Sequence, residues 1–171
     1  NTNYRAGELE YLLKQSDSRA IILIDDFRGH SFIDTLYELC PELKTATPGK
    51  LESERLPLLK TVVVISDKSY PGTYSYEAFL ALSEQVSDET LIERKQSLHF
   101  DDVINIQYTS GTTGFPKGVM LTHANILNNA LHIAEMMRLT PEDRLCIPVP
   151  FFHCFGCVIG TLTIVSAGGT M

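Results

Sequence analysis

The sequence predicts an α/β protein in which a layered, largely parallel sheet is flanked by helices. Short apolar runs, such as Ala20 to Ile24 and Thr61 to Ile65, indicate buried strands because they lack alternating polar residues. A segment with the apolar spacing of an amphipathic helix, Tyr4 to Gln15, precedes the first run. Strands that alternate with helices favour a parallel sheet covered by those helices.

Charges and caps mark the helices of the first half. The segment from Tyr4 to Gln15 has acidic residues early and Lys14 late, which is the order that favours a helix. Serine is a preferred N-cap because its hydroxyl accepts a hydrogen bond from a free backbone N–H group. Two further helices are therefore predicted, Phe32 to Leu39 after Ser31 and Tyr76 to Leu82 after Ser75.

The second half continues the pattern. Apolar segments at Val103 to Tyr108 and Val119 to Leu121 are expected to form strands, and Thr122 is expected to cap a helix that reaches about Leu139. The polar stretch from Ser87 to Asp102 is expected to be a surface connection. Two elements are predicted near the end, a buried strand from Arg144 to Pro148 and a helix from Cys154 to Val165.

Composition narrows the classes of partner. The chain has 171 residues, of which 44% are hydrophobic, so it is long enough to bury a core. Its net charge of −7 argues against nucleic acid or an anionic membrane as the main partner. No charged residue occurs from Leu145 to Met171, but prolines and glycines interrupt this stretch, so no membrane-spanning helix is expected. Without a recognisable signal segment, the cytoplasm is the expected location.

The two ends of the chain indicate a piece of a longer protein. The first residues already belong to a predicted helix, and the last ones begin a new strand. We therefore expect residues 1–171 to form a single truncated piece of a larger domain.

A loop rich in glycine and hydroxyl groups lies between two apolar segments, at Thr109 to Gly118. Glycines let backbone N–H groups approach an anion closely, and hydroxyls and a lysine add donors and positive charge. Such a loop suits a polyphosphate. A flexible turn is the alternative, and the spacing differs from that of the common P-loop. The loop residues that we expect to bind the phosphates are Thr109, Ser110, Gly111, Thr112, Thr113, Gly114, Lys117 and Gly118.

A second short pattern is Cys154-Phe155-Gly156-Cys157, which follows His153. Two cysteines at this spacing occur in redox pairs and in zinc sites. No second pair of ligands with zinc spacing occurs in the sequence, so a metal or redox function is the less favoured interpretation.

The loop closely resembles the phosphate-binding signature of the acyl-adenylate-forming superfamily, which includes acyl-CoA synthetases, luciferases and adenylation domains of peptide synthetases. Similarity extends over most of the chain and is strongest to fatty-acyl and related acyl-CoA synthetases. The resemblance implies part of the large N-terminal, AMP-binding domain of such an enzyme. Other segments that carry the resemblance are Asn3 to Arg5, Glu8 to Leu13, Ala20 to Ile22, Asp102-Val103 and Pro150 to Gly156.

The resemblance implies a two-step reaction. A carboxylate attacks the α-phosphorus of ATP, giving acyl-AMP and pyrophosphate, and a thiol, usually that of coenzyme A, then takes the acyl group. Lys117 would neutralise the leaving pyrophosphate, and Thr109 is the expected contact to Mg²⁺. His153 would border the acyl pocket near the reacting carboxylate. The catalytic candidates are therefore Lys117 and His153.

The resemblance also implies partners. These are a carboxylic acid, expected to be a fatty acid, together with ATP, Mg²⁺ and coenzyme A. The family's adenine and ribose motifs lie downstream of this chain, so the isolated piece is expected to be inactive and to pack on the rest of its own polypeptide. A homodimer is left open. The alternative is a stand-alone nucleotide-binding module without catalysis.

Overall fold

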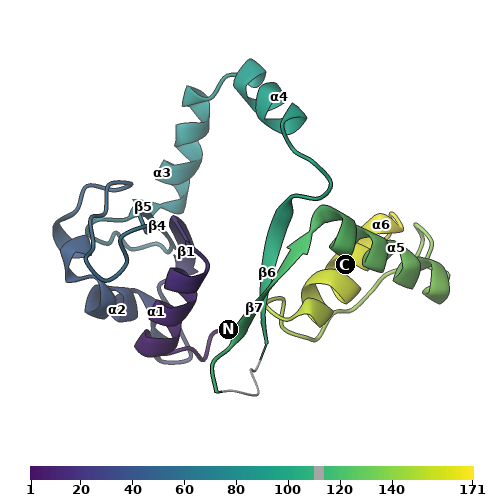
Figure 1. Cartoon of the computed structure of the whole chain (residues 1–171), viewed down its shortest axis with the longest axis horizontal. Coiled ribbons are helices and arrows are strands. Elements are labelled where there is room, and N and C mark those ends of the chain that lie inside the picture. The colour runs from purple at the N-terminus through teal and green to yellow at the C-terminus, as the bar shows by residue number, and fades with distance from the viewer. Residues whose placement is uncertain (110–113) are drawn as a thin grey trace. The chain divides into compact units, whose positions relative to one another are not determined.

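The computed structural model describes residues 1–109 and 114–171 of the chain (Figure 1). The predicted phosphate-binding residues Ser110, Gly111, Thr112 and Thr113 lie outside the described residues. The described chain divides into two compact units, residues 1–94 and 95–171. The expectation that the whole chain is one piece of a larger domain remains a prediction.

The first unit contains the parallel sheet. Strands β1 (Ala20–Ile24), β4 (Thr61–Ile65) and β5 (Tyr74–Ser75) pair in the order β1-β4-β5, and both pairings are parallel. β2 and β3 form a short antiparallel hairpin. The other elements of this unit are α1 (Ala6–Gln15), β2 (Asp26–Phe27), β3 (His30–Ser31), α2 (Phe32–Leu39), η1 (Pro41–Thr45), α3 (Tyr76–Ala81), η2 (Leu82–Gln85) and the start of α4 (Asp88–Gln96).

The second unit is built on an antiparallel hairpin. Strand β6 (Val103–Thr109) pairs with β7 (Lys117–Thr122), and α5 (His123–Met137) follows directly. The π-helical segment η3 (Phe155–Leu162) and the short helix α6 (Thr163–Ser166) pack with α5. The hairpin is antiparallel because a connection of seven residues is too short for the crossover that parallel strands need. The prediction of an α/β fold with a parallel sheet flanked by helices is confirmed, whereas β6 and β7 form a separate antiparallel pair.

The predicted caps are confirmed. Ser31 Oγ accepts a hydrogen bond from Asp34 N at 3.1 Å, and Ser75 Oγ accepts one from Ala78 N at 3.1 Å. Thr122 begins α5 through a reciprocal pair with Asn125, at 3.2 Å and 3.0 Å. Each cap satisfies a backbone N–H group that would otherwise lack a partner in the first turn.

The core of the first unit lies between α1, α2 and the sheet. Leu36 and Leu39 of α2 are almost completely buried, as are Val62 and Val63 of β4. A run of aliphatic side chains buried on both faces is what places β4 in the centre of the sheet. The second unit has a smaller core, formed by Ile126, Ala130 and Val158.

Three expectations were wrong in part. The stretch from Ser87 to Asp102 contains α4, which has no buried residue, so it lacks the apolar pattern that would have revealed it. The segment from Arg144 to Pro148 forms only a single parallel bridge, between Arg144 and Thr170, and its residues are not buried. Prolines 148 and 150 have no N–H group for a ladder, which limits strand formation there.

The third difference concerns the last helix. A helix follows Cys154 as expected, but most of it is wound as a π-helix. Thr161 Oγ1 donates to Gly156 O at 3.0 Å, and Thr163 Oγ1 donates to Val158 O at 3.2 Å. These hydroxyls reach carbonyls five residues earlier, which fits the wider winding of η3.

A charged cluster joins α1 to the loop before β4. The Glu10 carboxylate accepts hydrogen bonds from Lys14 at 2.7 Å and from Arg55. The bond from Arg55, followed by that from Lys14, lowers the pKa of Glu10 from 4.5 to about 2. The lowered pKa means that the cluster stabilises the fold fully above pH 4.5, and that this contribution is lost as the pH falls from 4.5 towards 2.

We expect Glu10→Gln to lower the free energy of unfolding at pH 7, because it removes the carboxylate that pairs with Lys14 and Arg55. The expected loss is only about 1 kcal/mol, since both cations are half exposed and solvent screens their attraction to Glu10. The difference from the wild type should vanish near pH 2, and denaturant unfolding at several pH values measures it. Glu52→Gln is the control, since Glu52 is exposed and forms no ion pair within residues 1–109 and 114–171. An equal, pH-independent loss in both variants would contradict the assignment.

Candidate functional site

The candidate site lies at the loop end of the β6–β7 hairpin, where the connection between the two strands begins and ends. In the register of this hairpin, Thr109 is directly opposite Lys117, and Tyr108 is opposite Gly118. Residues that face each other across an antiparallel pair project their side chains on the same face, with Cβ atoms roughly 5 Å apart. The hairpin therefore places Thr109 and Lys117 opposite each other at the two ends of the predicted phosphate loop.

Lys117 is available to an anion. Its side chain is exposed, and no carboxylate pairs with it in the part of the chain that the structure describes. A lysine ammonium is a compact charge with three donors, which suits several phosphate oxygens at once. Thr109 is also exposed and could offer its hydroxyl to a metal-bound phosphate or to Mg²⁺.

The two described glycines of the loop have different structural roles. Gly114 has φ +94°, a backbone conformation that other residues rarely adopt, and open space surrounds the position of its absent Cβ. At Gly118, a Cβ would approach Ile106 Cγ2 to 3.0 Å and the Tyr108 ring to 3.3 Å. Gly118 therefore makes room for cross-strand side chains, a packing role that accompanies its predicted place in phosphate binding.

His153 belongs to a different part of the same unit. It precedes η3, it is exposed, and its Nδ1 accepts a hydrogen bond from Phe155 N at 3.1 Å. Cys154 Sγ lies 3.8 Å from the same Nδ1. Within the described residues its ring forms no hydrogen bond with Lys117 or Thr109. The structure thus brings Thr109 and Lys117 together and leaves a contribution of His153 to the same site as a prediction.

Gly156 fixes the turn that carries His153. A Cβ on Gly156 would lie 2.4 Å from Pro150 O, which is shorter than any normal contact. The close approach holds the start of η3 against the Pro150-Phe151 backbone. The resemblance to the family motif at Pro150 to Gly156 thereby corresponds to a tightly packed turn rather than to a loose loop.

Sequence reasoning did not identify one structurally important carboxylate, that of Asp25, which directly follows β1. Its Oδ2 accepts hydrogen bonds from Ser66 Oγ at 2.7 Å and from Tyr70 OH at 2.9 Å. The hydrogen bond from Ser66, and then that from Tyr70, lowers the pKa of Asp25. No local pattern marks such a residue, because both donors follow more than 40 positions later. Asp25 ties the carboxyl ends of β1 and β4 together.

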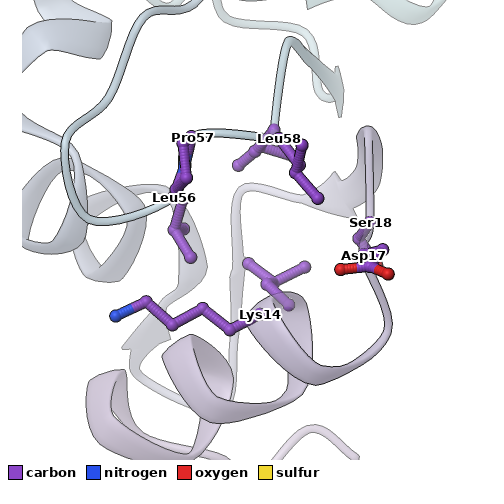
Figure 2. Close-up of a pocket in the computed structure, with 8 residues that line it drawn as sticks. Lys14, Asp17, Ser18, Leu56, Pro57 and Leu58 are labelled. Atoms are coloured by element: carbon purple, nitrogen blue, oxygen red, sulfur yellow. The ribbon is translucent and has the colours of Figure 1, made fainter.

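A small hollow in the first unit is not suited to a nucleotide. Figure 2 shows its leucine and proline side chains facing Lys14 and Asp17 near the end of α1. Its volume is about 180 Å³, and the ammonium of Lys14 already pairs with Glu10. Apolar walls of this kind offer few donors to a polyphosphate.

The metal interpretation of Cys154 and Cys157 has no support from geometry. Within residues 1–109 and 114–171, no group of three or more His, Cys, Asp or Glu side chains is arranged to hold a metal ion. All four cysteines are free thiols. The helices within the described residues are too short or too polar to span a bilayer.

The model of the AMP-binding enzyme family matches residues 1–171. The chain therefore belongs to the AMP-binding enzyme family, in agreement with the resemblance to acyl-adenylate-forming enzymes.

Two relatives have names that describe an acyl-CoA synthetase or an acyl-CoA ligase. YngI of Bacillus subtilis (strain 168), named as an acyl-CoA synthetase, is 58% identical over 171 residues, which are all of this chain and 31% of YngI. The human mitochondrial medium-chain acyl-CoA ligase ACSF2 is 40% identical over 176 residues, which cover all of this chain and 28% of ACSF2. The chain thus spans about a third or less of the length of these relatives.

Two solved structures share the fold. The anthranilate CoA ligase AuaEII, in complex with anthranoyl-AMP, has a TM-score of 0.71 at 22% identity, over 99% of this chain and 28% of that one. ATP-bound MatB from Rhodopseudomonas palustris has a TM-score of 0.65 at 23% identity, over all of this chain and 28% of that one. At this identity the likeness concerns the fold.

Proposed function

We propose that the full-length protein containing this chain is an ATP-dependent acid–thiol ligase. It would activate a carboxylate, proposed to be that of a fatty acid, as acyl-AMP and transfer the acyl group to coenzyme A. The observation that carries the proposal is the register of the β6–β7 hairpin, which sets Lys117 opposite Thr109 at the ends of a loop of phosphate-binding composition. Family membership supports the use of ATP and coenzyme A.

The chain's residues would act by positioning and by charge. Adenylation expels pyrophosphate, on which negative charge accumulates as the bond to the α-phosphorus breaks. The Lys117 ammonium would stabilise this charge, and the hydroxyl of Thr109 would orient the phosphates or hold Mg²⁺. When bound, Mg²⁺ would neutralise phosphate charge. His153 would border the acyl chain near the reacting carboxylate.

Two further expectations accompany this proposal. We expect the remainder of the polypeptide to cover apolar side chains that are exposed on this chain, such as Met120 of β7 and Leu131 of α5, at 67% and 51% exposure. We also expect the isolated 171 residues to form no acyl-AMP. A cytoplasmic location and a homodimer remain untested expectations.

The test is pyrophosphate release from ATP by the full-length protein with a panel of carboxylic acids of different chain lengths and with aromatic acids. Release that depends on one class of acid, followed by thioester formation when coenzyme A is added, would support the ligase and name its substrate. ATP binding without release for any acid would instead favour a nucleotide-binding module. Release from the isolated chain would contradict its expected inactivity.

A further inference from the structure

Helix α4 is short, and none of its nine residues is buried. Ser87 precedes it, and the Ser87 Oγ accepts a hydrogen bond from Thr90 N at 3.2 Å, which caps the first turn. A cap alone does not hold a helix of this length, because isolated helices shorter than roughly 12–15 residues are marginal in water. Short helices in proteins are stabilised mainly by packing of one face. We therefore looked for a face of α4 that is suited to packing.

One side of α4 combines two aliphatic residues with two opposite charges. A helix has about 3.6 residues per turn, so positions 88, 91, 92 and 95 lie on the same side. We call these four residues the α4 stripe: Asp88, Leu91, Ile92 and Lys95. Leu91 and Ile92 are 46% and 51% exposed. Neither charged residue forms an ion pair within the part of the chain that the structure describes. The stripe follows from the winding of this one helix.

The order of residues along the α4 stripe makes it complementary to itself. It begins with a carboxylate, has the two aliphatic side chains in the middle and ends with an ammonium. If two copies of α4 lie antiparallel about a two-fold axis, Asp88 of each copy faces Lys95 of the other, and Leu91 faces Ile92. Both charge pairs are then attractive, whereas a parallel arrangement would place like charges together.

We propose that the α4 stripe is an interface through which two copies of the full-length protein form an antiparallel helix pair. Val86 and Leu98 are also exposed and lie two residues before and two residues after α4. The same two-fold axis brings the Val86 end of one copy to the Leu98 end of the other, which adds apolar contact area. The proposal does not depend on the ligase activity proposed above.

The size of the α4 stripe sets the strength of this dimer. One short helix buries less than the roughly 1,600 Å² of a standard interface, so the association is weak and reversible. Sedimentation velocity of the full-length protein from about 1 to 300 µM covers the range of such interfaces. We expect monomer at the lowest concentration and dimer at the highest. Raising the ionic strength from about 0.05 to 0.5 M should increase the Kd several-fold, because salt screens exposed charge pairs.

The same measurement can overturn the proposal. A full-length protein that stays monomeric at every concentration has no such interface, and this is the result expected if the rest of the polypeptide covers the α4 stripe instead.

Zero-length cross-linking locates the interface without any variant. A carbodiimide joins a carboxylate to an amine only where the two are in contact. In a mixture of isotopically labelled and unlabelled protein, we expect an amide between Asp88 of one copy and Lys95 of the other. Within one helix these residues are about 10 Å apart along the axis, which is beyond the reach of the reagent. A dimer whose cross-links all lie outside α4 would overturn the proposal.

Exchange of the two charges tests the antiparallel arrangement. Asp88→Lys alone and Lys95→Asp alone each place like charges opposite each other in both pairs, so each variant should raise the Kd of its own dimer about tenfold or more. An equimolar mixture of the two variants restores both attractions and should form a heterodimer about as tight as the wild-type dimer. A mixture that stays monomeric where the wild type dimerises would overturn the arrangement.

Glu93→Lys is the matched control for these variants. Glu93 is exposed and lies on the side of α4 away from the stripe, so the same reversal of charge should change the Kd by less than about twofold. Weakening as large as that caused by Asp88→Lys would show that net charge, and not the α4 stripe, controls the association. The cross-link map of the wild type keeps this conclusion independent of the folding of the variants.

Discussion

Replacing Lys117 by alanine in the full-length protein is expected to lower acid-dependent pyrophosphate release by about 10²–10³-fold. The cause is the loss of a charge aimed at the leaving pyrophosphate, where negative charge grows in the transition state; removal of one such group typically has this effect. The fall should appear mainly in kcat, with a smaller rise in the KM for ATP, since the charge matters most after the bond begins to break.

Two variants control this experiment. Lys50→Ala removes an exposed lysine of the first unit, outside the loop, and should leave release unchanged. Lys117→Arg keeps the charge but replaces a compact ammonium with a planar group, and should recover only part of the activity. Normal pyrophosphate release by Lys117→Ala would be compatible with a ligase but would contradict the role that we propose for Lys117 of the hairpin in stabilising pyrophosphate.

Replacing Gly72 by alanine is expected to destabilise the first unit by about 2–5 kcal/mol. A Cβ at this position would lie 1.7 Å from Leu43 O, and the backbone has φ +74°. The left-handed conformation costs about 1–2 kcal/mol for an alanine, and relief of the clash with a backbone carbonyl costs about 1–3 kcal/mol more. Hydrogen exchange of the buried amides of β4 measures the free energy of opening.

Gly29→Ala is the matched control for this variant. Gly29 has φ +77°, but the space where its Cβ would lie is empty. It therefore carries the conformational cost of about 1–2 kcal/mol without the clash. Equal losses in the two variants would show that the Leu43 carbonyl moves aside freely.

Local sequence was sufficient for most of the first unit. The N-caps Ser31 and Ser75 act through backbone groups three residues away, so the residues that form the helix start are adjacent in sequence. The strands β1 and β4 were equally evident from their apolar runs of five residues. The predicted burial is confirmed for β4 only and was wrong for β1, whose Ile22 side chain is 55% exposed. Helix α4 shows the limit of this approach, since a helix without a buried face leaves no apolar period to detect.

The sequence by itself determined the family, the residue types of the predicted phosphate loop and the helix starts. Only the tertiary structure decided that β6 and β7 form an antiparallel hairpin with Lys117 opposite Thr109, that Asp25 joins β1 to β4, and that Cys154 lies beside Nδ1 of His153. The physical reason is the separation along the sequence between the residues that interact. Caps and apolar runs depend on neighbours within a few residues, whereas strand register, the partners of Asp25 and the orientation of a side chain depend on which distant segments the packed core brings together.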